Sequence, residues 1–208
     1  MIGKILFCLL IGYLCGSISS GYLVGRAYHL DIRKQGSGNA GATNALRTLG
    51  IKGGLLTFFG DAFKVIIPVM IIRFCYSSLE PSWEIYALYL GLGAVLGHNF
   101  PVWLKFKGGK GIAVTSGVIL AIADWRITLI GLIVFICVVG YTRYVSVGSL
   151  IVAWLLPINT VLFYRNEDDF TYMLVLCLIF TALAYWRHKE NIKRLCSGTE
   201  RKIGTSHE

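Results

Sequence analysis

Residues 53–73 read GGLLTFFGDAFKVIIPVMIIR, a long and almost uninterrupted apolar run. Its only charged residues are Asp61, Lys64 and the final arginine. A helix needs about 20 mainly apolar residues to cross about 30 Å of hydrocarbon, so the stretch predicts a transmembrane helix. The whole chain shares this bias: 55% of its residues are hydrophobic and 15% are charged, whereas soluble domains are about one quarter charged. We therefore expect an integral membrane protein.

Six further apolar windows predict an all-α integral membrane protein, a polytopic bundle of about seven transmembrane helices. The seven windows fall at about 3–25, 53–73, 83–97, 112–123, 127–142, 145–164 and 171–186. They lack the alternation of barrel strands, so helices are expected. The third to fifth windows are short enough to be re-entrant or half-spans, which leaves five spans as an alternative. Residues 1–208 are interpreted as a single polytopic domain, with the first window a retained span rather than a cleaved signal.

The distribution of basic residues predicts the orientation, because Lys and Arg accumulate on the cytoplasmic side. With seven spans and the N-terminus outside, the 20 Lys and Arg residues divide unequally. Four lie outside, Lys64 lies within a span, and the other fifteen lie inside, as does the C-terminus. The net charge of +9 then reflects this bias and attraction to anionic headgroups, not a nucleic-acid partner. The six cysteines show no C-x-x-C pair or metal-ligand spacing, so no metal and no cofactor is expected.

The first polar motif is RKQGSGNAGATNALRTLG, residues 33–50, which contains a G-x-G-x-x-G pattern. A dinucleotide site would need a preceding strand, but an apolar span comes before this loop, so that interpretation fails. Closely spaced glycines still let backbone N–H groups approach an anion, and arginine adds a planar fork suited to phosphate. An ordinary polar turn is the alternative. The candidate ligands here are Ser37, Gly38, Asn39, Thr43, Asn44 and Arg47.

The second motif is GHNFPVWLKFKGGKGIA, residues 97–113. It resembles a phosphate loop, but a Walker sequence has Ser or Thr after its lysine and this chain has Gly111, so a nucleoside triphosphate is disfavoured. Lysines around a flexible backbone that leads into a helix nevertheless suit an anion. Lysines that merely flank a span are the alternative, although this explains the glycines poorly. The candidates are Lys107, Gly108, Gly109, Lys110 and Gly111.

The third motif is WRHKENIKRLCSGTERKIG, residues 186–204. His188 and Asn191 are three residues apart and would share one face of a helix; a solvated amphipathic tail is the alternative. Asp61 and Lys64 have the same spacing inside a span, where ionisable residues are functional candidates. Mutual neutralisation that supports a neighbouring loop accounts for this pair equally well.

The predicted topology brings all three motifs to the cytoplasmic face. One site there, with apolar helices around it, would suit a phosphate headgroup attached to a lipid tail. A transporter of a phosphate ester is an alternative, but its site would be expected near the membrane midplane on broken helices. A non-catalytic membrane subunit would not need so many phosphate-binding residues.

Three segments resemble the signature motifs of the acyl-phosphate-dependent glycerol-3-phosphate acyltransferase (PlsY) family of bacterial inner membranes. They are SGNAGATNALRTLG, GHNFPVWLKFKGGKG and HKENIKRLCSGTE. The similarity extends over nearly the whole chain. It departs from the family pattern at Ser19 and Ser20, where a proline and an apolar residue are expected, and at Lys189, where arginine is usual.

The resemblance implies acyl transfer from acyl phosphate to the 1-hydroxyl of sn-glycerol 3-phosphate, giving lysophosphatidic acid and phosphate. It implies a multi-pass protein of the bacterial inner membrane with a cytoplasmic active site, and no acyl-CoA, acyl carrier protein or obligate protein partner. The family's essential residues correspond to Ser37 and Arg47, its phosphate loop to residues 107–111, and its important histidine and asparagine to His188 and Asn191. Glu200 matches a glutamate with a structural role.

Two mechanisms are consistent with these residues. In the first, His188 is the general base for the glycerol hydroxyl. In the second, the phosphate of the donor takes that proton and His188 only orients a substrate. The second is favoured, because no carboxylate stands in the sequence where it would obviously polarise His188. A covalent acyl intermediate on Ser37 is a third possibility.

Overall fold

The computed structural model describes residues 2–78 and 82–204, and every regular element in these ranges is helical. This confirms the all-helical prediction. The described chain divides into two compact units, one that ends at Ile122 and one that begins at Ala123. The first contains α1 (Ile2–Ser17), α2 (Ser20–Ala27), η1 (Ile32–Lys34), α3 (Ala42–Tyr76), α4 (Trp83–Asn99), η2 (Val102–Leu104) and α5 (Ile112–Ile122). The second contains α6 (Trp125–Thr142), α7 (Val145–Val152), α8 (Leu155–Phe163), α9 (Phe170–Arg187) and α10 (Lys189–Cys196).

Six helical segments in the described ranges are long and apolar enough to cross a membrane. Two windows that the sequence left open are among them, because the third extends over Trp83–Leu104 and the fifth over Trp125–Thr142. The fourth, Ile112–Ile122, has 11 residues. At 1.5 Å per residue it covers only about 17 Å, too short to span alone. The helix count is thus close to seven, with one half-length helix.

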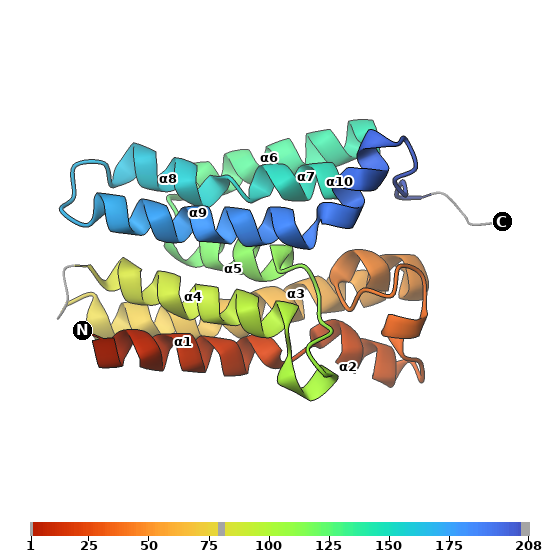
Figure 1. Ribbon diagram of the computed structural model, residues 1–208, viewed down its shortest axis with the longest axis horizontal. Helices are drawn as coiled ribbons and strands as arrows, with labels where there is room; N and C mark the ends of the chain where they lie inside the picture. Colours follow the sequence, from red (N-terminus) through yellow and green to blue (C-terminus); the bar gives the residue numbers. More distant parts are fainter. Residues whose placement is uncertain (1, 79–81, 205–208) are drawn as a thin grey trace. The chain divides into compact units, whose positions relative to one another are not determined.

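In the first unit, α1, α3 and α4 lie side by side, and α5 packs on α3 and α4 (Figure 1). Glycines allow α1 and α4 to approach closely. A Cβ atom at Gly12 would meet the backbone of Leu90, and one at Gly97 would meet the backbone of Tyr13. Small residues that let backbones meet are typical of helix contacts in membranes. The hydrophobic effect does not drive helices together in lipid, so close packing must stabilise the contact. This contact fixes the end of α4, from which the second motif departs.

Two irregularities shape the region around the first motif. The helix of the first window breaks at Ile18, and Ser19 caps α2 by accepting a hydrogen bond from the N–H of Tyr22 at 3.4 Å. The serine that departs from the family pattern therefore has a capping role here. α3 has a non-helical residue at Gly50, with φ of 74°. This bend separates a short first segment, which carries Arg47, from the long apolar remainder of α3.

In the second unit, the sixth window is likewise interrupted, where α7 ends and α8 begins. The hydroxyl of Thr181 donates a hydrogen bond to the carbonyl oxygen of Ala153 at 2.7 Å, at this interruption. Such side-chain donors satisfy carbonyls that a helix break frees in lipid. α6 packs on α7 and α8 packs on α9, while much of α6 presents large exposed apolar side chains. That exposure fits a surface covered by lipid.

Candidate functional site

Asn44 holds the first glycine-rich loop in shape. Its buried side chain donates hydrogen bonds to the carbonyl oxygens of Ile32 and Gln35, both at 3.0 Å, and accepts one from the N–H of Ser37 at 2.8 Å. Gly36 and Gly38 have φ of 56° and 72°, values that favour glycine. Both hydrogens of the Asn44 amide are thus donated to the protein itself. The geometry favours a loop-shaping role for Asn44 over the direct phosphate contact expected from the sequence.

Other polar groups of the first motif lie at the beginning of α3. Asn39 accepts a hydrogen bond from the N–H of Gly41 at 2.9 Å, and Gly41 precedes the first residue of the helix. The first N–H groups of a helix have no intrahelical partner and attract anions. Arg47 lies four residues after Thr43, on the same helix face, and Ser37 and Gly38 are exposed in the loop. The motif combines backbone donors, a hydroxyl and a guanidinium in one short region.

The second glycine-rich loop folds back on the end of α4. The N–H of Gly108 donates to the carbonyl oxygen of Asn99 at 3.2 Å, and that of Gly109 donates to the carbonyl oxygen of His98 at 3.0 Å. A Cβ atom at position 108 would meet the carbonyl oxygen of His98, and one at 109 would meet its Nε2 atom. Any side chain at these two positions would clash with His98, which explains why both are glycine. The alternative of lysines that merely flank a span did not explain these glycines.

The second loop leads directly into α5. Gly111 has φ of 85°, and its carbonyl oxygen accepts a hydrogen bond from the N–H of Thr115 at 2.8 Å, in the first turn of the helix. Lys107 is exposed and Lys110 is partly exposed beside it. The loop therefore provides a compact backbone, a helix N-terminus and two ammonium groups, a combination that attracts phosphate.

The structure reveals two residues to which the sequence analysis gave no role, His98 and Asn99. Both are buried at the end of α4. The amide of Asn99 faces Gly111, where an added Cβ atom would lie 3.0 Å from Oδ1. Two polar residues at the end of an apolar span, within the second motif, were the available signal.

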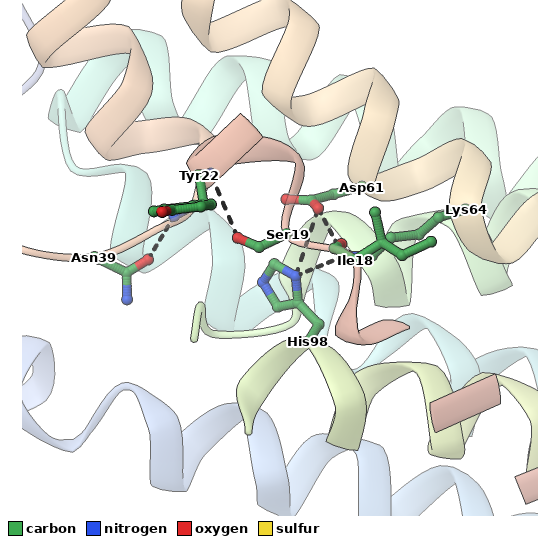
Figure 2. A network of polar contacts seen from close by, with 8 residues as sticks. Ile18, Ser19, Tyr22, Asn39, Asp61, Lys64 and His98 are labelled. Carbon is green, nitrogen blue, oxygen red and sulfur yellow. Dashed lines mark hydrogen bonds and ion pairs between the residues drawn. The ribbon is translucent and has the colours of Figure 1, made fainter. Parts of the chain in front are cut away.

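His98 joins the charged pair inside α3, as Figure 2 shows. The ammonium of Lys64 lies 2.7 Å from Oδ1 of Asp61, 3.0 Å from Nδ1 of His98 and 2.7 Å from the carbonyl oxygen of Ile18. The ion pair expected from the i, i+3 spacing therefore forms. Because His98 also supports Gly109, the geometry favours the interpretation that the pair supports a neighbouring loop.

The third motif lies in the second unit, where α9 meets α10. The buried His188 separates the two helices, and its Nδ1 atom lies 2.7 Å from the carbonyl oxygen of Ala184. A carbonyl oxygen only accepts, so Nδ1 carries the hydrogen, and in the neutral ring Nε2 is the acceptor. His188 can therefore accept a hydrogen bond or a proton at Nε2.

Glu200 is the centre of a buried polar cluster in the second unit. It accepts hydrogen bonds from Asn191 at 2.6 Å, Arg194 at 2.8 Å and Ser146 at 3.1 Å. Burial by itself raises the pKa of Glu200, but these three hydrogen bonds and the charge of Arg194 hold that pKa below its ordinary value. Glu200 thus fixes α10, which carries Asn191, to the beginning of α7. This agrees with the structural role that the resemblance implied.

No three His, Cys, Asp or Glu side chains lie close enough together to hold a metal ion within residues 2–78 and 82–204. The candidate residues of the first two motifs belong to the first unit, and His188 and Asn191 belong to the second.

Comparison with known proteins identifies the family. The family model described as glycerol-3-phosphate acyltransferase matches residues 6–198. A glycerol-3-phosphate acyltransferase from Clostridioides difficile is 44% identical over 200 residues, with 95% of each chain covered. One from Prochlorococcus marinus is 39% identical, with 96% of this chain and 98% of the relative covered.

Two solved structures have the same fold. Both are crystal structures of PlsY (YgiH), an integral membrane glycerol 3-phosphate acyltransferase. The glycerol 3-phosphate form is 36% identical, with a TM-score of 0.84 over 98% of this chain and 97% of that one. The lysophosphatidic acid form is 35% identical, with a TM-score of 0.82 over the same shares of the two chains. The matches in sequence and in structure agree, and the chain belongs to the glycerol-3-phosphate acyltransferase family of integral membrane enzymes.

Proposed function

We propose that this enzyme transfers a fatty acyl group from an acyl phosphate to the 1-hydroxyl of sn-glycerol 3-phosphate, releasing lysophosphatidic acid and inorganic phosphate. The observation that carries the proposal is a pair of glycine-rich loops in the first unit, each leading into a helix and each accompanied by basic side chains. Both substrates of this reaction carry a phosphate group. Solved relatives in glycerol 3-phosphate and lysophosphatidic acid forms support the choice of acceptor and product.

The chemistry requires positioning and charge neutralisation more than activation. The hydroxyl oxygen of glycerol 3-phosphate attacks the acyl carbonyl carbon, the bond between that carbon and the bridging oxygen breaks, and phosphate leaves with the electron pair. Negative charge accumulates on the departing phosphate, where backbone N–H groups and cationic side chains stabilise it. We assign these roles to Arg47, Lys107, Lys110 and the N–H groups of the two loops, with Ser37 as a hydrogen-bond donor.

The proton of the attacking hydroxyl passes to the phosphate of the donor. His188 orients the acceptor through Nε2, and Asn191 contributes to the same binding. This assignment is supported by the partner of Nδ1 in His188, which is a backbone carbonyl and not a carboxylate. The carboxylate of Glu200, which lies within the third motif, is bound by Asn191 and Arg194.

The turnover test uses purified protein with palmitoyl phosphate and glycerol 3-phosphate, and follows phosphate release. A parallel reaction contains palmitoyl-CoA instead, and there the release of the free CoA thiol is followed. The proposal expects release with acyl phosphate that depends on glycerol 3-phosphate, and no transfer from the CoA ester. Equal use of palmitoyl-CoA would contradict the assigned donor. Release without glycerol 3-phosphate would indicate simple hydrolysis.

We further propose that the enzyme lies in the bacterial inner membrane with its N-terminus outside and its active site on the cytoplasmic side. The unequal distribution of Lys and Arg supports this orientation. Two exposed cysteines provide the test, because Cys75 lies in the last turn of α3 and Cys196 is the last residue of α10. In single-cysteine variants, a membrane-impermeant maleimide should label Cys75 in intact cells and Cys196 only after permeabilisation. The reverse pattern would contradict the orientation.

A further inference from the structure

The network of Asp61, Lys64 and His98 is almost completely buried, with 0% exposure for the aspartate and 4% for the histidine. Lysine has three hydrogens to donate and cannot accept. The three short contacts of Lys64, to Asp61, His98 and the Ile18 carbonyl oxygen, correspond to these three donors. They come from three different places in the first unit: α3 itself, the end of α4, and the break between α1 and α2 (Figure 2). One ammonium group therefore joins these three segments.

From His98 the network reaches the second glycine-rich loop. Nδ1 of the ring faces Lys64, and Nε2, on the opposite side of the ring, is where a Cβ atom at Gly109 would lie. The carbonyl oxygen of the same residue accepts the N–H of Gly109 at 3.0 Å. The second glycine-rich loop therefore packs directly against both the ring and the backbone of His98. Rotation of the ring would displace the loop.

From Ile18 the network reaches the first glycine-rich loop. Ile18 immediately precedes Ser19, the cap of α2, so the hydrogen bond from Lys64 fixes where α2 begins. One residue into α2, a Cβ atom at Gly21 would meet the carbonyl oxygen of Ala40, which lies in the first loop. α2 therefore packs against that loop at backbone distance. The position of α2 sets the position of the loop.

We infer that Lys64, Asp61 and His98 form a positioning network that holds the two glycine-rich loops at the separation needed to bind both substrates. The inference rests on the proposed function, and none of the three residues touches substrate in it. A buried charge that loses one of its partners is left uncompensated, so the three groups stabilise one another only when all of them are in place. This requirement favours one arrangement of the three side chains, and that arrangement fixes the positions of both loops relative to the helices.

The test separates positioning from stability by neutralising both charges together. The double variant Asp61→Asn/Lys64→Met leaves no buried charge without a partner, so it should fold, with a modest fall in Tm because the carbonyl oxygen of Ile18 loses its donor. Its KM should nevertheless rise about tenfold or more for glycerol 3-phosphate and for palmitoyl phosphate, because both loops lose their anchor. The matched control is Asp124→Asn/Arg126→Met, which removes an exposed ion pair at the beginning of α6 and should leave KM and kcat unchanged.

Unchanged KM values in a folded double variant would overturn the inference, as would a loss that disappears after normalisation to folded protein. If the double variant does not fold, Gly109→Ala and His98→Asn decide the question in a double-mutant cycle. The loss of kcat/KM in the combined variant is expected to differ from the sum of the losses in the two single variants. Additive losses would overturn the inference. Absence of turnover in the parent would instead count against the proposed function, so the two failures are distinguishable.

Discussion

The side-chain amide of Asn191 donates a 2.6 Å hydrogen bond to Glu200, a buried carboxylate nine residues further along the chain. Arg194 and Ser146 bind the same carboxylate. The orientation of Asn191 therefore depends on a residue that does not itself belong to the proposed chemistry. Glu200 therefore has a structural role that lies outside the reaction itself.

Replacing Glu200 with Gln should destabilise the protein by about 2 kcal/mol, because a hydrogen bond to a charged group contributes about 1.5–3 kcal/mol. For a chain of this size that corresponds to a fall of about 5 °C in Tm. Thermal unfolding in detergent measures it. Replacing the exposed Glu190 with Gln is the matched control and should leave Tm unchanged. Equal Tm values for the Glu200 variant and the parent would contradict the role of Glu200.

The same cluster predicts a pH dependence of stability. The pKa of Glu200 is lower in the folded protein than in the unfolded chain, where it is about 4.3. Its contribution is therefore complete at neutral pH and is lost as the pH falls below about 4.3 and through the lower folded pKa. Tm measured between about pH 3 and 7 should decline more steeply at the acid end in the parent than in Glu200→Gln. Parallel curves would show that Glu200 does not titrate differently on folding.

Replacing His188 with Gln should keep kcat within about tenfold of the parent, because an orienting role needs hydrogen bonding but not proton transfer. Removing a general base costs a factor of about 10²–10⁴. Steady-state kinetics with both substrates distinguish the two cases. A fall in kcat of about 10³ with an unchanged KM for glycerol 3-phosphate would establish His188 as the base and contradict proton transfer to the donor phosphate.

Replacing Asn44 with Ala should reduce kcat/KM by at least about tenfold, because three loop groups lose their hydrogen-bond partner and each buried unsatisfied group costs about 1–3 kcal/mol. Asn39→Ala is the comparison, since its oxygen accepts one backbone N–H in the same loop. It should have the smaller effect if Asn44 shapes the loop. Equal losses would indicate that both asparagines act mainly as ligands.

Replacing Gly93 with Leu should prevent the close packing of α1 and α4, because its Cβ atom would already meet the backbone of Leu9. Forcing bulk into such a contact costs about 1–3 kcal/mol or more. Gly3→Leu on α1 is the control, since beyond the local backbone of α1 no atom lies within 4 Å of a Cβ there. Gel filtration and thermal unfolding should show loss of folded protein for Gly93→Leu alone. Equal behaviour of the two variants would contradict the packing argument.

Hydropathy was sufficient to predict the helices but not their interruptions. The fourth window, expected at 112–123, is the short helix Ile112–Ile122. Its short length could be read from the sequence, because the apolar run itself is short. The bend at Gly50 and the breaks after Ser17 and Val152 were not predicted. Each lies in or beside an apolar segment. At two of them a side chain from another helix binds a freed carbonyl oxygen: Lys64 binds that of Ile18, and Thr181 binds that of Ala153.

The motifs could be located from the sequence, but the contacts that shape them could not. Spacing alone predicted the pair of Asp61 and Lys64, whereas their third partner, His98, lies 34 residues after Lys64. Only the folded chain brings it to the pair. Similarly, composition suggested that Asn44 donates to phosphate, while the loop turns its own carbonyls toward that amide.

Acyl transfer from acyl phosphate can be measured by supplying labelled glycerol 3-phosphate with palmitoyl phosphate as the sole acyl donor and quantifying labelled lysophosphatidic acid. Product is expected with the parent and with Arg126→Ala, which removes an exposed arginine of α6. Almost no product is expected with Arg47→Ala. Full activity of folded Arg47→Ala, or no labelled product from folded parent protein, would exclude the proposed reaction and the role of Arg47 in it.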